Sequence, residues 1–530
     1  LRKHMSKHNK QLILAALFIG WGVDWLFYGK PVGISLLLFA LVAVGVMVWN
    51  GRLHQLPAQR RNLWLIVPLI FFAAMAFLRA NPFLTTMNTL AALGLLSYLL
   101  FFYAAGRVAG IGLNSAWLIP FRVGGHSLRL AGPVISDSVD VTWVRENGRK
   151  QLFPVVRGGL LASPVLIVFT ILLTSADVIF ADYIEKALSL DIIPHLLEWS
   201  WRGLLILLIG WLAVGALVYM VERRTQQDDE SAFEKALSHL PMKIGLGYIE
   251  SMTVLILVNL LFFSFVLVQF TYLFGGVVNV ETAGYTFADY ARRGFFELVA
   301  VAVLTLSLIL GLNWMTRRSS KGQIRWFNLL SSVMVGFVLV MLVSAFQRMR
   351  LYEAAFGYTR LRLYVYLFML WLGVLLIWFL LSQWLRPDRF AIGGLVVAMG
   401  FLTTLNVINP DAFIARQNVV RYQQTGDLDV VHLTTLSDDA VPVLVAALPI
   451  VSVDPQVVTK PECDYFWREE RADYDVDCDG TLSEVLTESL NGRFQEMQND
   501  TSWQAWQAYH ASRWRAYRQL RPLFGENNEL

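Results

Sequence analysis

Two groups of charged residues in this 530-residue chain have the types and spacing of a ligand-binding site. The larger group combines carboxylates and guanidinium groups near the ends of apolar segments, and its members are Asp289, Arg292, Arg293, Glu297, Arg348, Arg350 and Arg360. Unpaired charges are strongly unfavourable near hydrocarbon, so we expect these residues to converge into one outer charged cluster. Most of them are cations. The cluster would therefore attract a phosphate or carboxylate, and an anionic lipid or an envelope glycan is the predicted ligand.

A purely structural role for the same residues also fits the sequence. Thr286 and Asp289 have the spacing of a capping box, which predicts the start of a helix. Asp289, Arg293 and Glu297 then recur every four residues and form a stripe of alternating charge on one helical face. In this interpretation the arginines of the next loop pair with Asp289 or Glu297 inside the protein, and no external ligand is needed.

The second charged group lies in the polar C-terminal part of the chain, in the segment DVDCDGTLSE. Its members are Asp475, Asp477, Asp479 and Glu484. Alternate acids with a glycine at the turn can surround Ca²⁺ with oxygen ligands, as in the first half of an EF-hand loop. Leu486, however, occupies the twelfth position, where an EF-hand has a bidentate glutamate. An acidic turn that caps the next helix is the favoured alternative.

The two cysteines, Cys463 and Cys478, lie in the same C-terminal part. A lone pair outside the cytoplasm is predicted to form a disulfide, and closing a loop of this size would stabilise the fold by about 3 kcal/mol. The sequence has no Walker loop and no HExxH, GxSxG or CxxC motif, and its histidines have no metal-ligand spacing. The motifs of ATP-driven transport and zinc hydrolysis are therefore missing, and no cofactor is predicted beyond the possible calcium ion.

Long apolar segments must position these groups. Hydrophobic residues make up 56% of the chain and charged residues 16%, with a mean hydropathy of +0.51, which is typical of a multi-pass membrane protein. The apolar runs have about the twenty residues needed to cross the bilayer. Eleven spans are predicted, at 11–29, 31–49, 62–79, 84–105, 158–180, 201–220, 251–274, 295–315, 325–347, 364–384 and 389–407. The net charge of +4 is too small to indicate a nucleic-acid partner.

The predicted fold class is all-α. A helical membrane bundle covers 1–407, and a small, mainly helical extracytoplasmic domain covers 408–530. Lysine and arginine set the orientation, because 24 of the 44 fall in cytoplasmic segments and only 10 in outer loops if the N-terminus is inside. The cytoplasmic loop at 106–157 is compatible both with short strands and with an interfacial helix.

Aromatic residues are concentrated near the end of the chain. Trp503, Trp506, His510, Trp514 and Tyr517 would share one face of a single helix. Such a face could lie in the membrane interface. Packing of the aromatic rings against their own domain is favoured, because the domain has few other residues for a core.

Three segments are distinctive: DWLFYGKPVGI at 24–34, YTFADYARRGFFEL at 285–298, and the stretch that begins NPDAFIARQN at 409–444. In these segments the chain resembles a family of bacterial polytopic membrane proteins known only as a domain of unknown function. The resemblance implies a bacterial inner membrane protein with many spans. It implies no activity and no catalytic residues.

Two classes of function remain, and whether the protein is an enzyme stays open. The first is a transport, sensing or regulatory module whose outer face meets an envelope ligand. The second is a membrane enzyme that acts on a lipid-linked or phosphorylated substrate, with Asp289 or Glu297 as acid or base. The first class is favoured, because the first outer loop is only about one turn long, whereas many-span glycosyltransferases carry their acid in a large first outer loop.

Overall fold

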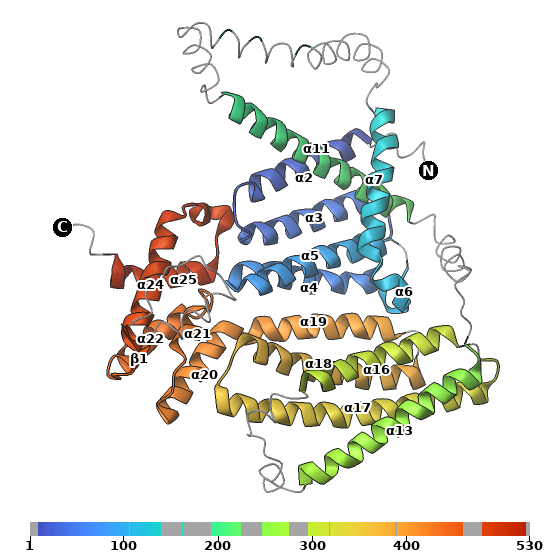
Figure 1. Cartoon of the computed structure of the whole chain (residues 1–530). Coiled ribbons are helices and arrows are strands. Elements are labelled where there is room, and N and C mark those ends of the chain that lie inside the picture. Colours follow the sequence, from blue (N-terminus) through green and yellow to red (C-terminus); the bar gives the residue numbers. More distant parts are fainter. Residues whose placement is uncertain are drawn as a thin grey trace.

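The computed structural model describes residues 9–104, 106–138, 192–223, 246–274, 295–316, 318–386, 389–458 and 480–525, together with positions 162, 169 and 173. Regular structure in these ranges is almost entirely helical (Figure 1). The sheet within them is a short antiparallel pair of β1 (Val457–Val458) and β2 (Gly480–Thr481), in which Val457 faces Thr481. The predicted all-α fold class is confirmed.

Ten helices of the described residues are long and apolar enough to cross a membrane. They are α2 (Asn9–Phe27), α3 (Ile34–Leu53), α4 (Ile66–Leu78) with the preceding turn η1 (Arg60–Leu65), α5 (Pro82–Phe102), α11 (Ile192–Glu222), α13 (Tyr248–Phe274), α16 (Phe295–Met315), α17 (Lys321–Phe356), α18 (Arg360–Leu385) and α19 (Phe390–Ile408). These helices coincide with ten of the predicted spans, and the span at 158–180 lies outside the described residues. Their many exposed apolar side chains fit a multi-pass membrane protein.

Some helices extend well beyond the predicted spans. The clearest example is α17, whose span was predicted at 325–347. This helix begins at a capping box formed by Ser320 and Gln323, and it ends before Gly357, whose φ of 73° is left-handed. The charges that end the apolar window, such as Arg348, do not end the helix. Hydropathy therefore predicts the part of a helix inside the membrane, whereas capping residues determine its full length.

The spans run between two ends of the bundle. We call the end at which α2 begins the N-side, and the opposite end, which carries the C-terminal region 408–525, the C-side (Figure 1). Asp24 near the end of α2 pairs with Arg202 in the first half of α11, whereas Asn50 near the end of α3 donates to the carbonyl of Leu217. Helix α11 therefore runs from the C-side to the N-side, in the same direction as α5. The predicted span at 158–180 lies between these two helices in the sequence.

The C-terminal region is helical, as predicted. Its elements are α20 (Pro410–Thr425), α21 (Val430–Thr434), α22 (Val441–Val451), α24 (Leu482–Asn499), η5 (Ser502–Gln504), η6 (Trp506–Ala508) and α25 (Ala511–Phe524). One apolar core contains α3, α4, α5, α19 and these C-terminal helices. A second contains α13, α16, α17 and α18, and a third contains α2, α7 and α11. The C-terminal region is thus packed directly on the membrane helices.

The aromatic residues at the end of the chain are mostly packed inside the C-terminal region. The ring of Trp503 is buried and lies 5.0 Å from that of Trp514 and 5.5 Å from that of Tyr517. The favoured interpretation of self-packing is confirmed for these rings. The prediction of one continuous helix is wrong, because two short turns, η5 and η6, precede α25. The Trp503 indole in η5 donates a hydrogen bond to the carbonyl of Met497, and this bond holds the turn against α24.

The described part of the loop 106–157 contains helices and no strand. Residues 106–138 form η2 (Val108–Gly110), α6 (Leu113–Ala116) and α7 (Ile119–Ser138), and the remainder of the loop lies outside the described residues. Helix α7 packs on α2, α5 and α11. In Figure 1 it runs across these spans at the N-side instead of along them.

Candidate functional site

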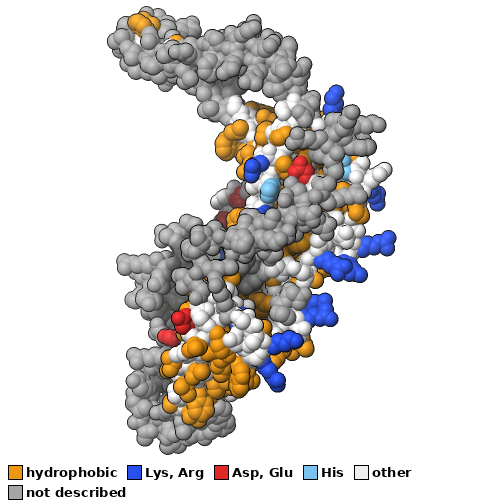
Figure 2. All heavy atoms as spheres, turned by 90° about the vertical axis from the view of Figure 1, so that its right-hand side faces the viewer, with side chains coloured by type: hydrophobic (Ala, Val, Ile, Leu, Met, Phe, Trp, Pro, Cys, Tyr) orange, Lys and Arg blue, Asp and Glu red, His pale blue; other side chains and the backbone are white. Residues whose placement is uncertain are grey.

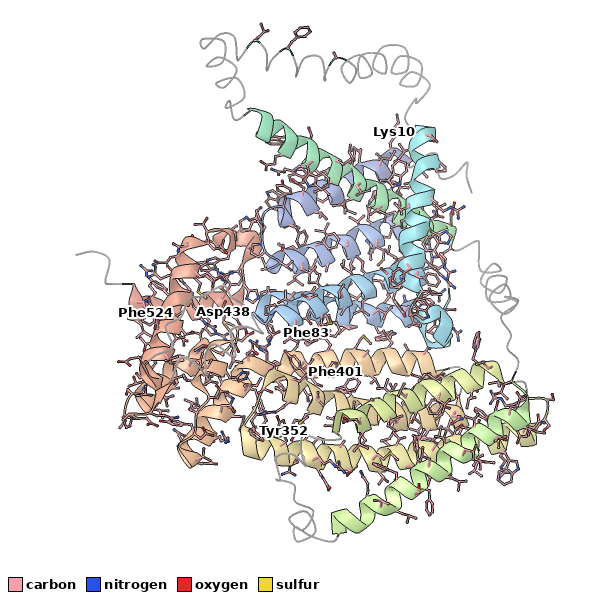
Figure 3. The ribbon with its side chains drawn as sticks, in the orientation of Figure 1. Lys10, Phe83, Tyr352, Phe401, Asp438 and Phe524 are labelled. Atoms are coloured by element: carbon pink, nitrogen blue, oxygen red, sulfur yellow. The ribbon has the colours of Figure 1, made fainter. Side chains whose placement is uncertain are left out.

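Buried and half-buried polar side chains are concentrated where the C-terminal region meets the C-side ends of the spans. We call this set the junction network, and its members are Arg79, Asn81, Asn88, Arg360, Asn406, Asp411, Ser437, Asp439, His510 and Ser512. Figure 3 labels one residue on each side of this junction, Phe83 in the first turn of α5 and Asp438 next to Asp439. The network joins segments that are hundreds of residues apart in the sequence.

Asp411 is at the centre of the network. Its carboxylate is 0% exposed and accepts two hydrogen bonds from Arg360, at 2.7 Å from Nε and 3.1 Å from Nη2. It also accepts hydrogen bonds from the amide of Asn81, at 3.0 Å, and from the backbone N–H of Ser437, at 3.0 Å. One buried carboxylate therefore connects the start of α18, the start of α5 and the loop before α22.

The charge state of Asp411 follows from these contacts. Burial alone would raise its pKa, because water stabilises a carboxylate better than a protein interior does. The charge and hydrogen bonds of Arg360, together with those of Ser437, outweigh burial and hold the pKa of Asp411 below the usual range of an aspartate. Asp411 is therefore ionised at neutral pH, and its ion pair with Arg360 is bidentate.

Asp439 caps a helix that is distant in the sequence. Its Oδ2 accepts the backbone N–H groups of Ala80, at 2.6 Å, and Asn81, at 3.2 Å, immediately before α5 begins. Its Oδ1 accepts a hydrogen bond from the hydroxyl of Ser512 in α25. The carboxylate has the position that a helix N-terminus favours for negative charge. Asp439 thus attaches both α5 and α25 to the loop before α22.

The two buried carboxylates have pKa values displaced in opposite directions. Burial, assisted by the negative charge of Asp411, raises the pKa of Asp439, although the hydrogen bond from Ser512 opposes this shift. Asp411, by contrast, forms an ion pair with Arg360. Different environments for two neighbouring acids are a typical arrangement for proton uptake, because one acid gains a proton in a pH range where the other stays ionised.

The loop that carries Asp439 is itself held in place. The guanidinium of Arg493 in α24 donates to the carbonyls of Thr434 and Leu436. Arg360 donates to the carbonyl of Thr435, at 2.8 Å. Three successive carbonyls are thus fixed by two arginines from different helices, so the two acids are held at defined positions.

The network continues into the membrane bundle. Asn88 in α5 and Asn406 in α19 exchange two amide hydrogen bonds of 2.8 Å, and both side chains are fully buried. Arg79 donates to the carbonyl of Asn406, at 2.7 Å, and the carbonyl of Arg79 lies 2.9 Å from Nε2 of His510. Burial lowers the pKa of His510, which favours the neutral ring. Among the described residues its Nδ1 has no hydrogen-bond partner, so it can accept one.

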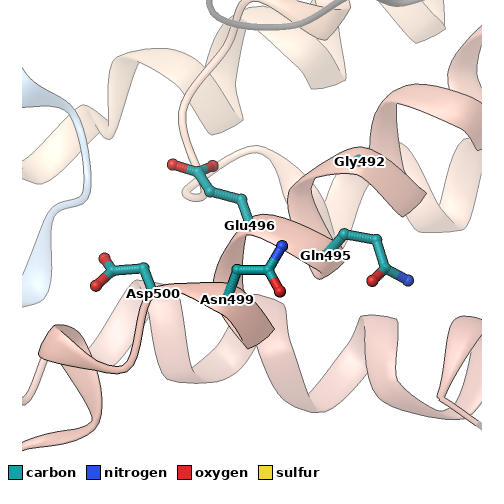
Figure 4. Close-up of a pocket in the computed structure, with 5 residues that line it drawn as sticks. All are labelled: Gly492, Gln495, Glu496, Asn499 and Asp500. Carbon is teal, nitrogen blue, oxygen red and sulfur yellow. The ribbon is translucent and has the colours of Figure 1, made fainter.

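The two carboxylates of the network are buried, and the pocket drawn in Figure 4 lies elsewhere. That depression has a volume of about 570 Å³ and is lined by Gly492, Gln495, Glu496, Asn499 and Asp500 of α24 and its end. None of these residues belongs to the junction network. The network therefore forms a packed interface between the C-terminal region and the spans, and its carboxylates do not line this pocket.

The predicted outer charged cluster is only partly within the described residues. Asp289, Arg292 and Arg293 lie outside them. Glu297 is exposed in the first turn of α16, Arg348 and Arg350 lie near the C-side end of α17, and Arg360 forms an ion pair with Asp411. The cluster as a whole stays a prediction. Of its members, Arg360 belongs to the junction network.

The other predicted site residues are also largely outside the described residues. These are Cys463 and Cys478 of the predicted disulfide and Asp475, Asp477 and Asp479 of the predicted calcium loop. Glu484 is described, and it forms a capping box with Thr481 at the start of α24, as the favoured alternative predicted. Among the described residues, no group of three or more His, Cys, Asp or Glu side chains is arranged to hold a metal ion.

Sequence reasoning recognised the two key acids only as local features. The sequence Asn409-Pro410-Asp411 is typical of a helix start with an acid in the first turn, and α20 does begin at Pro410. Ser437 and Asp439 precede α22, which begins at Val441. An acid directly after an apolar span, followed by a second acid before another helix, was the available signal for a buried pair.

The chain was compared with known proteins, and no curated protein and no solved structure matches it. A family described as Domain of unknown function (DUF4153) matches residues 66–447. The matched region includes every member of the junction network except His510 and Ser512. Because the match covers well over half of the chain, this protein belongs to the DUF4153 family, as the resemblance in its sequence predicted.

Proposed function

We propose that this protein is a membrane sensing or regulatory module in which the C-terminal region and the membrane spans change conformation together through the junction network. The observation that supports this proposal is the placement of Asp411. Its side chain belongs to the C-terminal region, yet it bonds to the starts of two different spans, through Arg360 and Asn81. Any movement of α20 must therefore be transmitted to α18 and α5, or must break these bonds.

The two spans lead to different cores. Helix α5 belongs to the core of α3, α4 and α19. Most buried apolar residues of α18 belong to the core of α13, α16 and α17, and α18 also packs on α19. A ligand or a proton that displaces the Asp411 carboxylate would remove the ionic partner of the half-buried Arg360, which is unfavourable enough to shift a helix position. The junction network is thus a suitable place for a stimulus at the C-terminal region to reach both cores.

The proposed orientation has the N-side in the cytoplasm and the C-terminal region outside, in a bacterial inner membrane. Figure 2 views the N-side and shows several Lys and Arg side chains on this face with few acidic ones. Positive residues near span ends tend to stay cytoplasmic, and this supports the proposal. The exposed Arg350 on the C-side would contribute to an outer face that attracts anions such as phosphorylated lipids or glycans.

The alternative, a membrane enzyme, is less well supported by the geometry. An acid or base must reach a substrate within hydrogen-bond distance. Asp411 is fully buried and Asp439 is 5% exposed, and both are saturated by protein donors. The closed arrangement favours a conformational role over a catalytic one.

Hydrogen exchange of the full chain in lipid nanodiscs tests the proposal, with the variant Asp411→Asn. We expect faster exchange in α20 to α22 and also in the first turns of α5 and α18, because Asp411 bonds to all three places. Asp427→Asn is the matched control, since Asp427 pairs with Arg421 on the surface of the same region. Its effect should remain within the end of α20. If Asp411→Asn accelerates exchange only within the C-terminal region, the proposed coupling is wrong.

A further inference from the structure

Helix α7 has an exposed apolar face that no described residue covers. Phe121 is 71% exposed and Leu128 is 52% exposed, and they are seven residues apart, which places them on the same side of the helix. Trp117, just before the helix, is also exposed, and its ring lies 6.4 Å from that of Phe121. An apolar surface of this kind is unfavourable in water and needs an apolar environment.

The opposite face of α7 is packed on the protein. Val123, Ser127, Ala131 and Val134 are buried at spacings of four, four and three residues. The backbone of Ser127 lies so close to Gly215 of α11 that a side-chain carbon at that glycine would overlap the Ser127 carbonyl. The exposed apolar face therefore results from a fixed orientation of the helix, since α7 cannot rotate without losing this contact.

A third face of α7 is basic. Arg122 and Arg129 are seven residues apart and each follows a member of the apolar face, so they are displaced from it by about 100° around the helix. His126 lies between them, and its ring stacks on that of Tyr219 in α11 at 4.9 Å. Burial and the nearby charges of Arg129, Arg122 and Arg223 lower the pKa of His126. Arg122 and Arg129 of α7 and Arg223, which directly follows α11, therefore all lie near His126 at the N-side.

The position of α7 determines what can cover it. The helix crosses α2, α5 and α11 near their N-side ends, where the lipid headgroups of a bilayer must lie (Figure 1). A helix in the plane of a membrane needs one face toward acyl chains and another toward headgroups, and a basic headgroup face favours acidic lipids. The sequence also includes three glycines and Pro133, which make an isolated helix unstable and make outside support necessary.

We propose that α7 is an interfacial helix that places Phe121 and Leu128 among acyl chains and binds the phosphate of an acidic phospholipid through Arg122 and Arg129. This site is on the face opposite the junction network and does not depend on the function proposed for that network. The ligand is a lipid of the N-side leaflet, and not a soluble phosphate.

Binding of phosphatidylglycerol to the purified full chain in detergent, followed by native mass spectrometry, tests the basic face. Each cation near an acidic membrane surface strengthens binding about fivefold, so Arg122→Gln with Arg129→Gln should weaken binding roughly 30-fold. The exposed pair Arg515→Gln with Arg518→Gln in the C-terminal region is the control and should leave binding unchanged. Equal binding by the wild type and the α7 double variant would overturn the proposal. Displacement of the lipid by millimolar inorganic phosphate would also overturn it, because the site would then be one for soluble phosphate.

Fluorescence quenching in nanodiscs tests the apolar face without removing both arginines. Single labels are attached at Leu128→Cys or Arg129→Cys in a chain whose two native cysteines are replaced by serine. Lipids carrying a nitroxide on the acyl chain should quench the label at position 128 more strongly, and aqueous iodide should quench the label at position 129 more strongly. If iodide quenches both labels equally, α7 does not lie in the membrane interface.

Discussion

Replacing Asp411 with asparagine should destabilise the protein more than any other conservative change in the C-terminal region. The substitution keeps the size of the side chain but removes its charge. Arg360 then faces a neutral amide, and the –NH₂ group of that amide replaces an acceptor oxygen among donors from Arg360, Asn81 and Ser437. At least one buried donor is left without an acceptor.

The magnitude follows from burial. Asp411 is fully buried and the Arg360 side chain is 29% exposed, so the pair is largely desolvated on the carboxylate side. Breaking a buried ion pair by removing one partner destabilises proteins by about 3–5 kcal/mol. The exposed end of Arg360 can recover some hydration, so we expect a loss near the lower limit, about 3 kcal/mol.

Unfolding of the full chain in mixed micelles measures this loss, and a double-mutant cycle with Arg360→Gln isolates the pair. The cycle should give a coupling free energy of about 1–3 kcal/mol, because the two side chains are in direct contact. Asp427→Asn, at an exposed pair, should change stability by less than about 1 kcal/mol. If Asp411→Asn is as mild as this control, the carboxylate is not buried against Arg360 and the description of the junction network is incorrect.

Three further predictions concern other parts of the structure. Because its folded-state pKa is raised, Asp439 contributes stability at low pH that is lost as the pH rises through that pKa. Lowering the pH from neutral toward the ordinary aspartate pKa of about 4 should therefore stabilise the wild type relative to Asp439→Asn. Equal slopes of unfolding free energy against pH would refute the burial of this acid. Asn88→Leu leaves Asn406 without its amide partner and should lower the unfolding free energy by about 1 kcal/mol. Adding Asn406→Leu should recover part of this loss in the same unfolding assay, whereas additive losses would show that the two amides do not pair. Gly33→Ala places a carbon 2.6 Å from the backbone of Ala508 and should destabilise the contact between the α2–α3 turn and the C-terminal region by about 1–3 kcal/mol. The control is Gly45→Ala, because Gly45 on α3 has open space beside it. Similar unfolding free energies of the two variants would contradict this packing.

The membrane spans were predictable because hydropathy acts locally. A run of about twenty apolar residues must cross the bilayer whatever surrounds it. The predicted ends were less accurate for α11 and α17, since these helices extend beyond their apolar windows. Capping residues, and not the limits of the apolar run, end α17. The helical nature of the C-terminal region also followed from local sequence.

The junction network was not predictable from local sequence, because its bonds join distant segments. Asp439 accepts the backbone N–H of Asn81, which lies 358 positions earlier in the chain and immediately precedes α5. Local rules assign each of these residues to its own helix start. The sequence predicted that Arg360 pairs with a carboxylate. Which carboxylate it contacts, Asp411, depends on how α20 packs against the start of α18.

The most direct test of the central claim is a density map of the full chain in lipid nanodiscs at neutral pH, at a resolution that shows side chains. The structure predicts continuous density between Asp411 and the guanidinium of Arg360, with the amide of Asn81 and the backbone of Ser437 on the remaining acceptor positions. A map in which Asp411 faces solvent, or in which the C-terminal region is detached from the starts of α5 and α18, would contradict the account.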